Sequence, residues 1–211
     1  MAKNSLFIVI EGLDGSGKSL ASKNLKKMLD TQFNGKIKRT YEPENSSCGG
    51  TYIRDVLEKR ITRFDPFVLA LAYAANRLDH NSRIINPWLD GETSKIIICD
   101  RYYLSSLVYN SSDDFSYLDV MLLNRKARKP DLIFFLNVST EVCRERMNKR
   151  NEPEELFEKN LDLFRDKYQE AIQFLQQERE HHIIEINGDQ TPENVVKDML
   201  EAITDFAPHW R

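Results

Sequence analysis

One short segment constrains the fold more than any other, the run Gly-Leu-Asp-Gly-Ser-Gly-Lys-Ser at residues 12–19. The apolar run 6–10 precedes it, and residues 20–33, which have helical periodicity, follow it. A short continuous apolar run is typical of a buried strand. Glycines let the backbone turn sharply and point its N–H groups inward at the start of the helix. The pattern therefore predicts an anion cradle between a strand and a helix.

These residues match the pattern G-x-x-x-x-G-K-[ST] of the P-loop, a cradle for nucleotide phosphates. In that pattern the lysine, here Lys18, reaches the β- and γ-phosphates, and the hydroxyl of Ser19 binds Mg²⁺. A glycine-rich turn with an incidental lysine explains the glycines but not the Lys18–Ser19 pair. We predict an ATP·Mg²⁺ site whose donor contacts come from Gly12, Leu13, Asp14, Gly15, Ser16, Gly17, Lys18, Ser19 and Leu20.

The rest of the chain alternates apolar runs with segments of helical periodicity. The apolar runs are 6–10, 37–41, 96–99, 132–138 and 183–186, and the helical segments are 20–33, 65–88, 140–150, 155–178 and one from 191. This alternation favours crossover connections and a mainly parallel sheet. We expect one α/β domain over residues 1–211 with a three-layer P-loop kinase fold. It has a five-stranded parallel sheet, helices on both faces and a short lid over about 144–157, and 44–50 is irregular.

Charge and cysteine usage narrow the class of protein. The formal net charge is −3, which argues against broad binding to nucleic acid or a membrane surface. Cys48, Cys99 and Cys143 are widely spaced, with no CxxC pair and no histidine at metal-ligand spacing, so we expect reduced thiols. The N-terminus lacks the features of a signal peptide, and no apolar run is long enough to span a bilayer. We expect a soluble, cytoplasmic protein.

A second wall of the site is predicted at residues 95–102, where an apolar strand ends in Asp100 and Arg101. Ligands of open parallel sheets bind outside the carboxyl ends of the strands. Asp100 then holds a Mg²⁺-bound water, and Arg101 pairs with a transferring phosphoryl group or an acceptor phosphate. The alternative is a strand-end salt bridge. A GTPase is disfavoured, because residues 148–151, the nearest match to a guanine-reading N-K-x-D, lack the Asp.

Five blocks in this order resemble the thymidylate kinase family: residues 11–19, 73–77, 100–102, 105–109 and 130–132. The resemblance implies that Tyr73 and Arg77 bind thymine, and their i, i+4 spacing puts them on one helix face. A surface cation–π pair is the alternative. The resemblance also implies that Ser106 and Tyr109 lie near the deoxyribose. The alternative is that they are a polar residue and a core aromatic of a short helix. Asp14 matches an acidic position near the acceptor sugar or the metal, and otherwise is a turn carboxylate.

The lid candidates are basic residues around 144–150. Arg146 and Arg150 are expected to contact the transferring phosphoryl group, and Arg144 the donor nucleotide. The family often has an Asp-Arg pair shortly afterwards, where this chain has residues 155–158, Glu-Leu-Phe-Glu, so Arg146 or Arg150 is the candidate to replace that charge. A solvated basic helix end is the alternative.

A second departure lies at residues 41–47, where the family often has Arg-Glu-Pro-Gly-Gly-Thr and this chain has Tyr-Glu-Pro-Glu-Asn-Ser-Ser. The candidates for contact with the acceptor phosphate are then Ser46, Ser47 and Arg54. The turn 187–189, Asn-Gly-Asp, resembles the region that borders the donor adenine.

The resulting hypothesis is transfer of the γ-phosphoryl group of ATP to dTMP, with Lys18, Arg101, Asp14, Arg146 and Arg150 at the reacting phosphates. One rival is a kinase of the same fold that acts on another nucleotide or a deoxynucleoside. The other is a nucleotide-binding regulatory module with little turnover. The family resemblance implies a homodimer, for which the helix at 65–88 offers an apolar face.

Overall fold

A computed structural model describes residues 5–33, 36–91, 93–150 and 155–208. Its strands form one sheet in the order β2-β3-β1-β4-β5, and every pair of neighbours is parallel. The strands are β1 (Leu6–Glu11), β2 (Lys36–Tyr41), β3 (Lys95–Asp100), β4 (Leu132–Asn137) and β5 (Ile183–Asn187). The predicted five-stranded parallel sheet is therefore confirmed.

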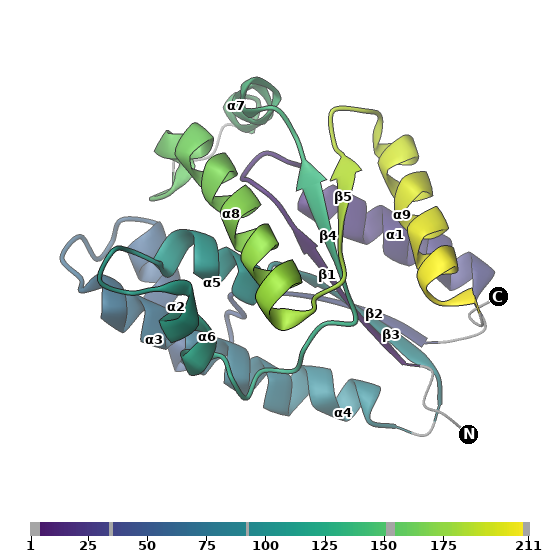
Figure 1. Ribbon diagram of the computed structural model, residues 1–211, viewed down its shortest axis with the longest axis horizontal. Helices are drawn as coiled ribbons and strands as arrows, with labels where there is room; N and C mark the ends of the chain where they lie inside the picture. Colours follow the sequence, from purple (N-terminus) through teal and green to yellow (C-terminus); the bar gives the residue numbers. More distant parts are fainter. Residues whose placement is uncertain (1–4, 34–35, 92, 151–154, 209–211) are drawn as a thin grey trace.

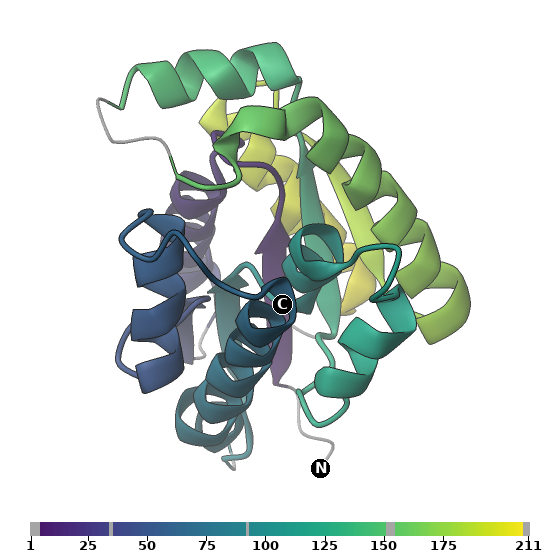
Figure 2. The ribbon, with the colours of Figure 1, turned by 90° about the vertical axis from the view of Figure 1, so that its left-hand side faces the viewer.

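Helices cover both faces of this sheet (Figure 1). On one face lie α1 (Lys18–Gln32) and α9 (Pro192–Phe206), and on the other α5 (Tyr103–Asn110) and α8 (Leu161–Arg179). Around the second face lie α2 (Cys48–Leu57), α3 (Pro66–His80), α6 (Tyr117–Leu123) and α7 (Thr140–Asn148), with α7 above α2 and α8 in Figure 2. The fold is the three-layer α/β arrangement predicted for a P-loop protein.

The core follows from the apolar runs. Nearly every residue of β1, β3 and β4 is buried, as expected of central parallel strands covered on both faces. In the edge strand β2, by contrast, Ile37 and Thr40 alone are buried. Because β3 pairs with β1, the end of β3 lies beside the P-loop, and the Arg101 N–H donates to the Ile10 carbonyl at 3.0 Å. Strand order thus brings both predicted walls of the site together.

The helix predicted over 65–88 has the right extent but not one regular geometry. It consists of α3, a π-helical turn at Asn81–Ile85 and the short α4 (Asn86–Leu89). Pro87 lies at the start of α4. A proline has no N–H to donate and its ring crowds the carbonyl of the preceding turn, which explains the change of helical geometry here.

Other predicted boundaries were wrong. The helix expected from residue 155 begins at Leu161, after a 3₁₀ turn at Glu158–Asn160. The preceding segment crosses to another element, because the Leu156 N–H donates to the Leu57 carbonyl at 3.2 Å. The stretch 44–50, expected to be irregular, contains the start of α2, which Ser47 caps, and α6 was not predicted.

The thiols of Cys99 and Cys143 are free and buried, and the side chain of Cys48 lies outside the described part of the structure. Among the described residues, no helix has the length and apolar character required to cross a bilayer.

Candidate active site

The P-loop owes its shape to glycines in conformations that other residues rarely adopt. Gly15 has φ of 81° and Gly17 has φ of 90°. Gly17 caps α1, and its carbonyl accepts from the N–H groups of Leu20 and Ala21. A Cβ on Gly15 would collide with the backbone of Cys143, whose Cα lies 2.9 Å away. The loop therefore packs directly on α7.

The P-loop borders a cavity of about 730 Å³, here called the P-loop cavity. Its walls include Lys18, Asp100 and Arg101 together with Arg146 and Arg150. Of the predicted donor contacts, the structure brings Asp14, Gly15, Ser16, Gly17, Lys18, Ser19 and Leu20 to this cavity. Gly12 and Leu13 lie behind it in the loop, and both are buried.

Lys18 is buried, and its ammonium group donates to the Leu13 carbonyl at 2.6 Å. Burial and the nearby Arg101 charge lower the pKa of Lys18 to about 8, although the surrounding carboxylates oppose this shift. A polyphosphate in the cavity would add negative charge beside Lys18 to that of the carboxylates, and this charge would raise the pKa of Lys18. A bound anion beside Lys18 would therefore stabilise its charged form.

Arg101 occupies the end of β3 in a left-handed conformation, with φ of 64°. One end of its guanidinium group pairs with Asp14, and the other donates to the hydroxyls of Ser105 and Tyr168 at 3.0 and 3.1 Å. The Tyr109 ring lies beneath it at 5.5 Å. Burial raises the pKa of Asp14, but the charges of Arg101 and Lys18 outweigh it and leave that pKa below its usual value. Asp14 is thus an ionised partner of Arg101.

The residues present fit a magnesium ion. Asp100 is 6% exposed, and within the described residues its Oδ1 atom has no hydrogen-bond partner. Its Oδ2 atom has only a 3.4 Å contact with the Ser22 hydroxyl. Ser19 is exposed and lines the same cavity. A buried carboxylate oxygen and a nearby hydroxyl are the oxygen donors that Mg²⁺ prefers, usually together with water and phosphate.

A second, smaller cavity of about 210 Å³ lies against α3 and is here called the α3 cavity. Six of the residues predicted to bind the acceptor line it: Arg54, Tyr73, Arg77, Arg101, Ser106 and Tyr109. Glu155 and Phe157, just after the undescribed part of the lid, also line it. The structure therefore brings together residues from α2, α3, α5 and the lid.

Arg77 is 2% exposed, so it is not part of a surface cation–π pair. It donates to Glu42 at 2.6 Å, Ser106 at 3.0 Å and Asn124 at 2.6 Å. Glu42 is held from its other side by His80 at 3.0 Å. These contacts fix the guanidinium group at the cavity wall while Tyr73, one helical turn earlier, offers its ring.

The two cavities meet at a short wall. Asp14, Glu42 and Arg101 line both of them. A group leaving one cavity for the other therefore passes the Arg101–Asp14 pair. A cation, Arg101, therefore lies at the wall that the two cavities share.

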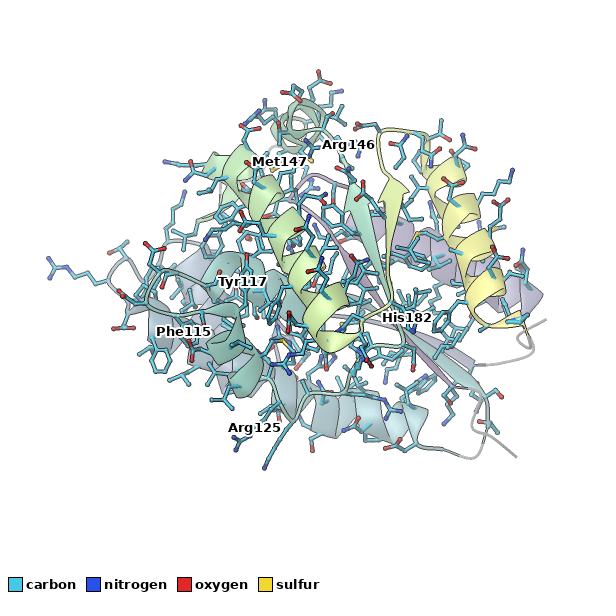
Figure 3. All side chains as sticks on the ribbon, viewed as in Figure 1. Phe115, Tyr117, Arg125, Arg146, Met147 and His182 are labelled. Atoms are coloured by element: carbon cyan, nitrogen blue, oxygen red, sulfur yellow. The ribbon has the colours of Figure 1, made fainter. Side chains whose placement is uncertain are left out.

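The lid cations have different surroundings. Arg146 donates to the carbonyls of Ser16 at 3.3 Å and Gly188 at 3.1 Å, and reaches from α7 toward the ends of β4 and β5 (Figure 3). Arg150 lines the P-loop cavity. Arg144 instead pairs with Asp162 on the surface and lines neither cavity. Residues 151–154 of the predicted lid lie outside the described part of the chain.

The atypical segment at 41–54 contributes less than expected. Ser47 caps α2 by accepting from the Gly50 N–H at 3.0 Å, and Ser46 bonds Glu44 at 2.6 Å. Of the three candidates for acceptor-phosphate contact, Arg54 alone lines the α3 cavity, where it pairs with Glu155 at 2.9 Å.

Sequence reasoning missed several residues at the site. Asn124 and Tyr168 hold the two arginines but belong to no local motif, so no sequence signal marks them. Arg39 lines the P-loop cavity two residues before Tyr41 on β2. Period-two spacing could have placed Arg39 and Tyr41 on one face of the strand.

The fold and the site define a P-loop nucleotide-binding protein with a nucleotide-kinase arrangement, a phosphate cradle beside a second cavity. A sequence model of the family described as thymidylate kinase matches residues 10–199. The chain belongs to this family.

Individual relatives agree with the family match. A probable thymidylate kinase of Methanocaldococcus jannaschii is 37% identical over 172 residues, covering 81% of this chain and 83% of the relative. A probable thymidylate kinase of Caldivirga maquilingensis is 32% identical, covering 96% and 95%. A thymidylate kinase of Staphylococcus epidermidis is 29% identical, covering 96% and 98%.

Proposed function

We propose that this protein is an ATP-dependent thymidylate kinase, which converts ATP and dTMP to ADP and dTDP. The observation that carries the proposal is the shared wall, since Arg101 and Asp14 border both the P-loop cavity and the α3 cavity. Family membership supports the identity of the acceptor.

Catalysis rests on positioning and charge. The P-loop and Lys18 hold the donor phosphates, and Arg146 and Arg150 approach them from the lid side. Mg²⁺ near Ser19 and Asp100 would neutralise negative charge on those phosphates. Arg101 stabilises charge on the transferring group, which passes directly from donor to acceptor without a covalent enzyme intermediate.

The acceptor nucleoside lies in the α3 cavity. The Tyr73 ring stacks on the base while Arg77, fixed by Glu42 and Asn124, reads its edge. Tyr109 crowds the sugar and disfavours a 2′-hydroxyl, and Arg54 exchanges Glu155 for the acceptor phosphate. Arg144 is not assigned to the donor, because Asp162 holds it at the surface.

A panel of nucleosides and nucleoside monophosphates, each mixed with ATP and Mg²⁺ and followed by ADP release, tests the proposal. Turnover selective for dTMP is expected. Turnover with another acceptor alone would reject thymidylate as the substrate. Absence of turnover with every acceptor would favour a binding module.

The role of Arg101 has its own test. Removing one preorganised cation from a transition state typically costs about 10²–10³ in rate, so Arg101→Ala is expected to lower kcat by that factor. Arg125→Ala is the matched control, because Arg125 is exposed, lines neither cavity and points outward from the ribbon (Figure 3). A normal kcat in Arg101→Ala would remove Arg101 from the mechanism.

The proposal includes a homodimer. Phe67, Val68 and Leu71 on α3 are 48%, 47% and 40% exposed, and Leu118 and Leu122 on α6 are each 57% exposed. Phe115 joins the two groups through an edge contact with Phe67 at 5.2 Å. An apolar face of this kind suits a self-complementary interface. A cytoplasmic location is also proposed, because the free thiols Cys99 and Cys143 suit a reducing compartment.

A further inference from the structure

The hydroxyl of Tyr168 lies at the centre of a buried polar cluster. Tyr168 belongs to α8 and is 0% exposed, and its ring packs against Phe135 with centroids 5.1 Å apart. Its hydroxyl lies 3.1 Å from Arg101 Nη1 and from Ser105 Oγ, and 3.2 Å from Glu11 Oε2 and the Gly12 carbonyl. One oxygen atom thus contacts the end of β1, the P-loop, α5 and the arginine at the shared wall.

The direction of these hydrogen bonds follows from the donors available. A guanidinium group can only donate, so the Tyr168 oxygen accepts from Arg101. Tyr168 has one proton of its own, and Glu11 Oε2 and the Gly12 carbonyl are acceptors for it. Glu11 is fully buried and is itself anchored by the N–H groups of Tyr102 at 2.7 Å and Ser105 at 3.1 Å. The Tyr168 oxygen, which accepts from Arg101, is therefore held in a fixed orientation.

We infer that Tyr168 is a positioning residue for the phosphoryl-transfer step, acting through the Arg101 guanidinium group. Tyr168 and Ser105 hold Nη1 from the protein interior, while Nη2 points to Asp14 at the wall between the cavities. Nη2 is the end that a phosphoryl group can take over from Asp14. Fixing Nη1 keeps the guanidinium plane aimed at that point, so little reorganisation is needed when charge develops there. This inference rests on the proposed function.

The placement of Tyr168 on α8 adds a link to the lid. The segment leading into α8 carries Glu155 and Phe157, which line the α3 cavity. The helix that supports Arg101 is therefore continuous in sequence with a wall of the acceptor site, and Tyr168 is its direct contact with the arginine.

The test is Tyr168→Phe, which keeps the ring and removes one oxygen atom. We expect kcat at saturating substrates to fall about tenfold, equivalent to about 1.4 kcal/mol, with both KM values changed less than about twofold. The matched control is Tyr103→Phe. Tyr103 is 2% exposed and its hydroxyl bonds His181 at 2.5 Å, but it lines neither cavity. Both variants lose a buried hydroxyl contact, and only Tyr168→Phe is expected to lose kcat.

A double-mutant cycle separates positioning from general destabilisation. In an Arg101→Ala background, assayed with radiolabelled ATP to detect slow turnover, Tyr168→Phe is expected to cause no further loss of kcat. A normal kcat in Tyr168→Phe would overturn the inference, as would an equal fold-loss in both backgrounds or in Tyr103→Phe. If Arg101→Ala alone retains a normal kcat, the proposed role of Arg101 fails instead, which is a distinguishable result.

Discussion

Lys18 is buried and the Arg101 side chain is 18% exposed, and the charges of these two cations of the P-loop cavity behave differently. Burial lowers the pKa of Lys18 to about 8, so this group titrates in an accessible range. Burial also acts to lower the pKa of Arg101, but Asp14 together with Tyr109, Tyr168 and Glu11 outweighs it, and the pKa lies well above its usual value. Arg101 is therefore always charged, whereas the charge on Lys18 depends on pH and on the anion beside it.

Nucleotide binding is expected to take up protons above about pH 8. The free protein has lost the Lys18 proton there, and bound phosphates raise the pKa of Lys18 and restore it. Affinity for ATP therefore falls as pH rises from about 8 toward the usual pKa of lysine. Calorimetry in two buffers of different ionisation enthalpy measures the uptake at pH 8.5–9, a range set by that lowered pKa. Uptake in Lys18→Met equal to that of the wild type would assign the proton to another group.

Gly15→Ala is expected to weaken nucleotide binding. The new Cβ meets the backbone of Cys143, and φ of 81° is unfavourable for any residue with a Cβ. Relief of that contact moves the loop, so ATP affinity is expected to fall at least about tenfold, as the loss of about 1.4 kcal/mol of binding would give. Gly91→Ala is the control, since its Cβ would meet the side chain of Lys95, which can move. Equal affinity in the two variants, measured by equilibrium binding, would contradict this account.

At the scale of helices and strands, local pattern predicts the central elements and fails where distant contacts decide. The apolar runs of β1, β3 and β4 are long enough to mark buried strands without further information. The start of α8 could not be predicted from local pattern in this way. Phe157 fits a helical period, but the N–H of its neighbour Leu156 donates to the end of α2 and the Phe157 ring packs on Tyr109 at 5.0 Å.

The residues of the site also fall into those that local spacing predicts and those that distant contacts place. The i, i+4 spacing of Tyr73 and Arg77 is a local property of α3, so their shared face could be predicted. The contacts of Tyr168 and Asn124 depend on how α8 and the end of α6 pack beside other elements, far away in sequence. No spacing rule covers that separation.

The ion pair between Glu42 and Arg77 joins the end of β2 to α3, and its side chains are 3% and 2% exposed. Removing one partner of a buried pair leaves an uncompensated charge, so Glu42→Gln is expected to lower the free energy of unfolding by about 3 kcal/mol. The control is Asp79→Asn, one helical turn from Arg83, where the exposed pair is worth about 0–1 kcal/mol. Urea unfolding measures both. Similar losses of unfolding free energy in the two variants would show that burial does not determine the strength of the Glu42–Arg77 pair.

For the whole molecule, the exposed apolar face on α3 and α6 predicts self-association. Leu118→Glu puts a charge at a residue that is 57% exposed in one chain but buried in the proposed dimer, and is expected to give a monomer. Leu163→Glu on α8, where the leucine is 52% exposed outside that face, is expected to leave the dimer intact. Size-exclusion chromatography with light scattering reports the mass. A wild-type monomer at micromolar concentration, or a dimeric Leu118→Glu variant, would reject this interface.

The two ends of the lid line different cavities. Arg146 and Arg150 line the P-loop cavity at one end, and Glu155 and Phe157 line the α3 cavity at the other. A chimera that received this segment from a relative would therefore change affinity for donor and acceptor together. Arg54 pairs with Glu155, so position 54 and the lid segment depend on each other. Engineering the acceptor preference of this enzyme would therefore require changing position 54 together with the segment.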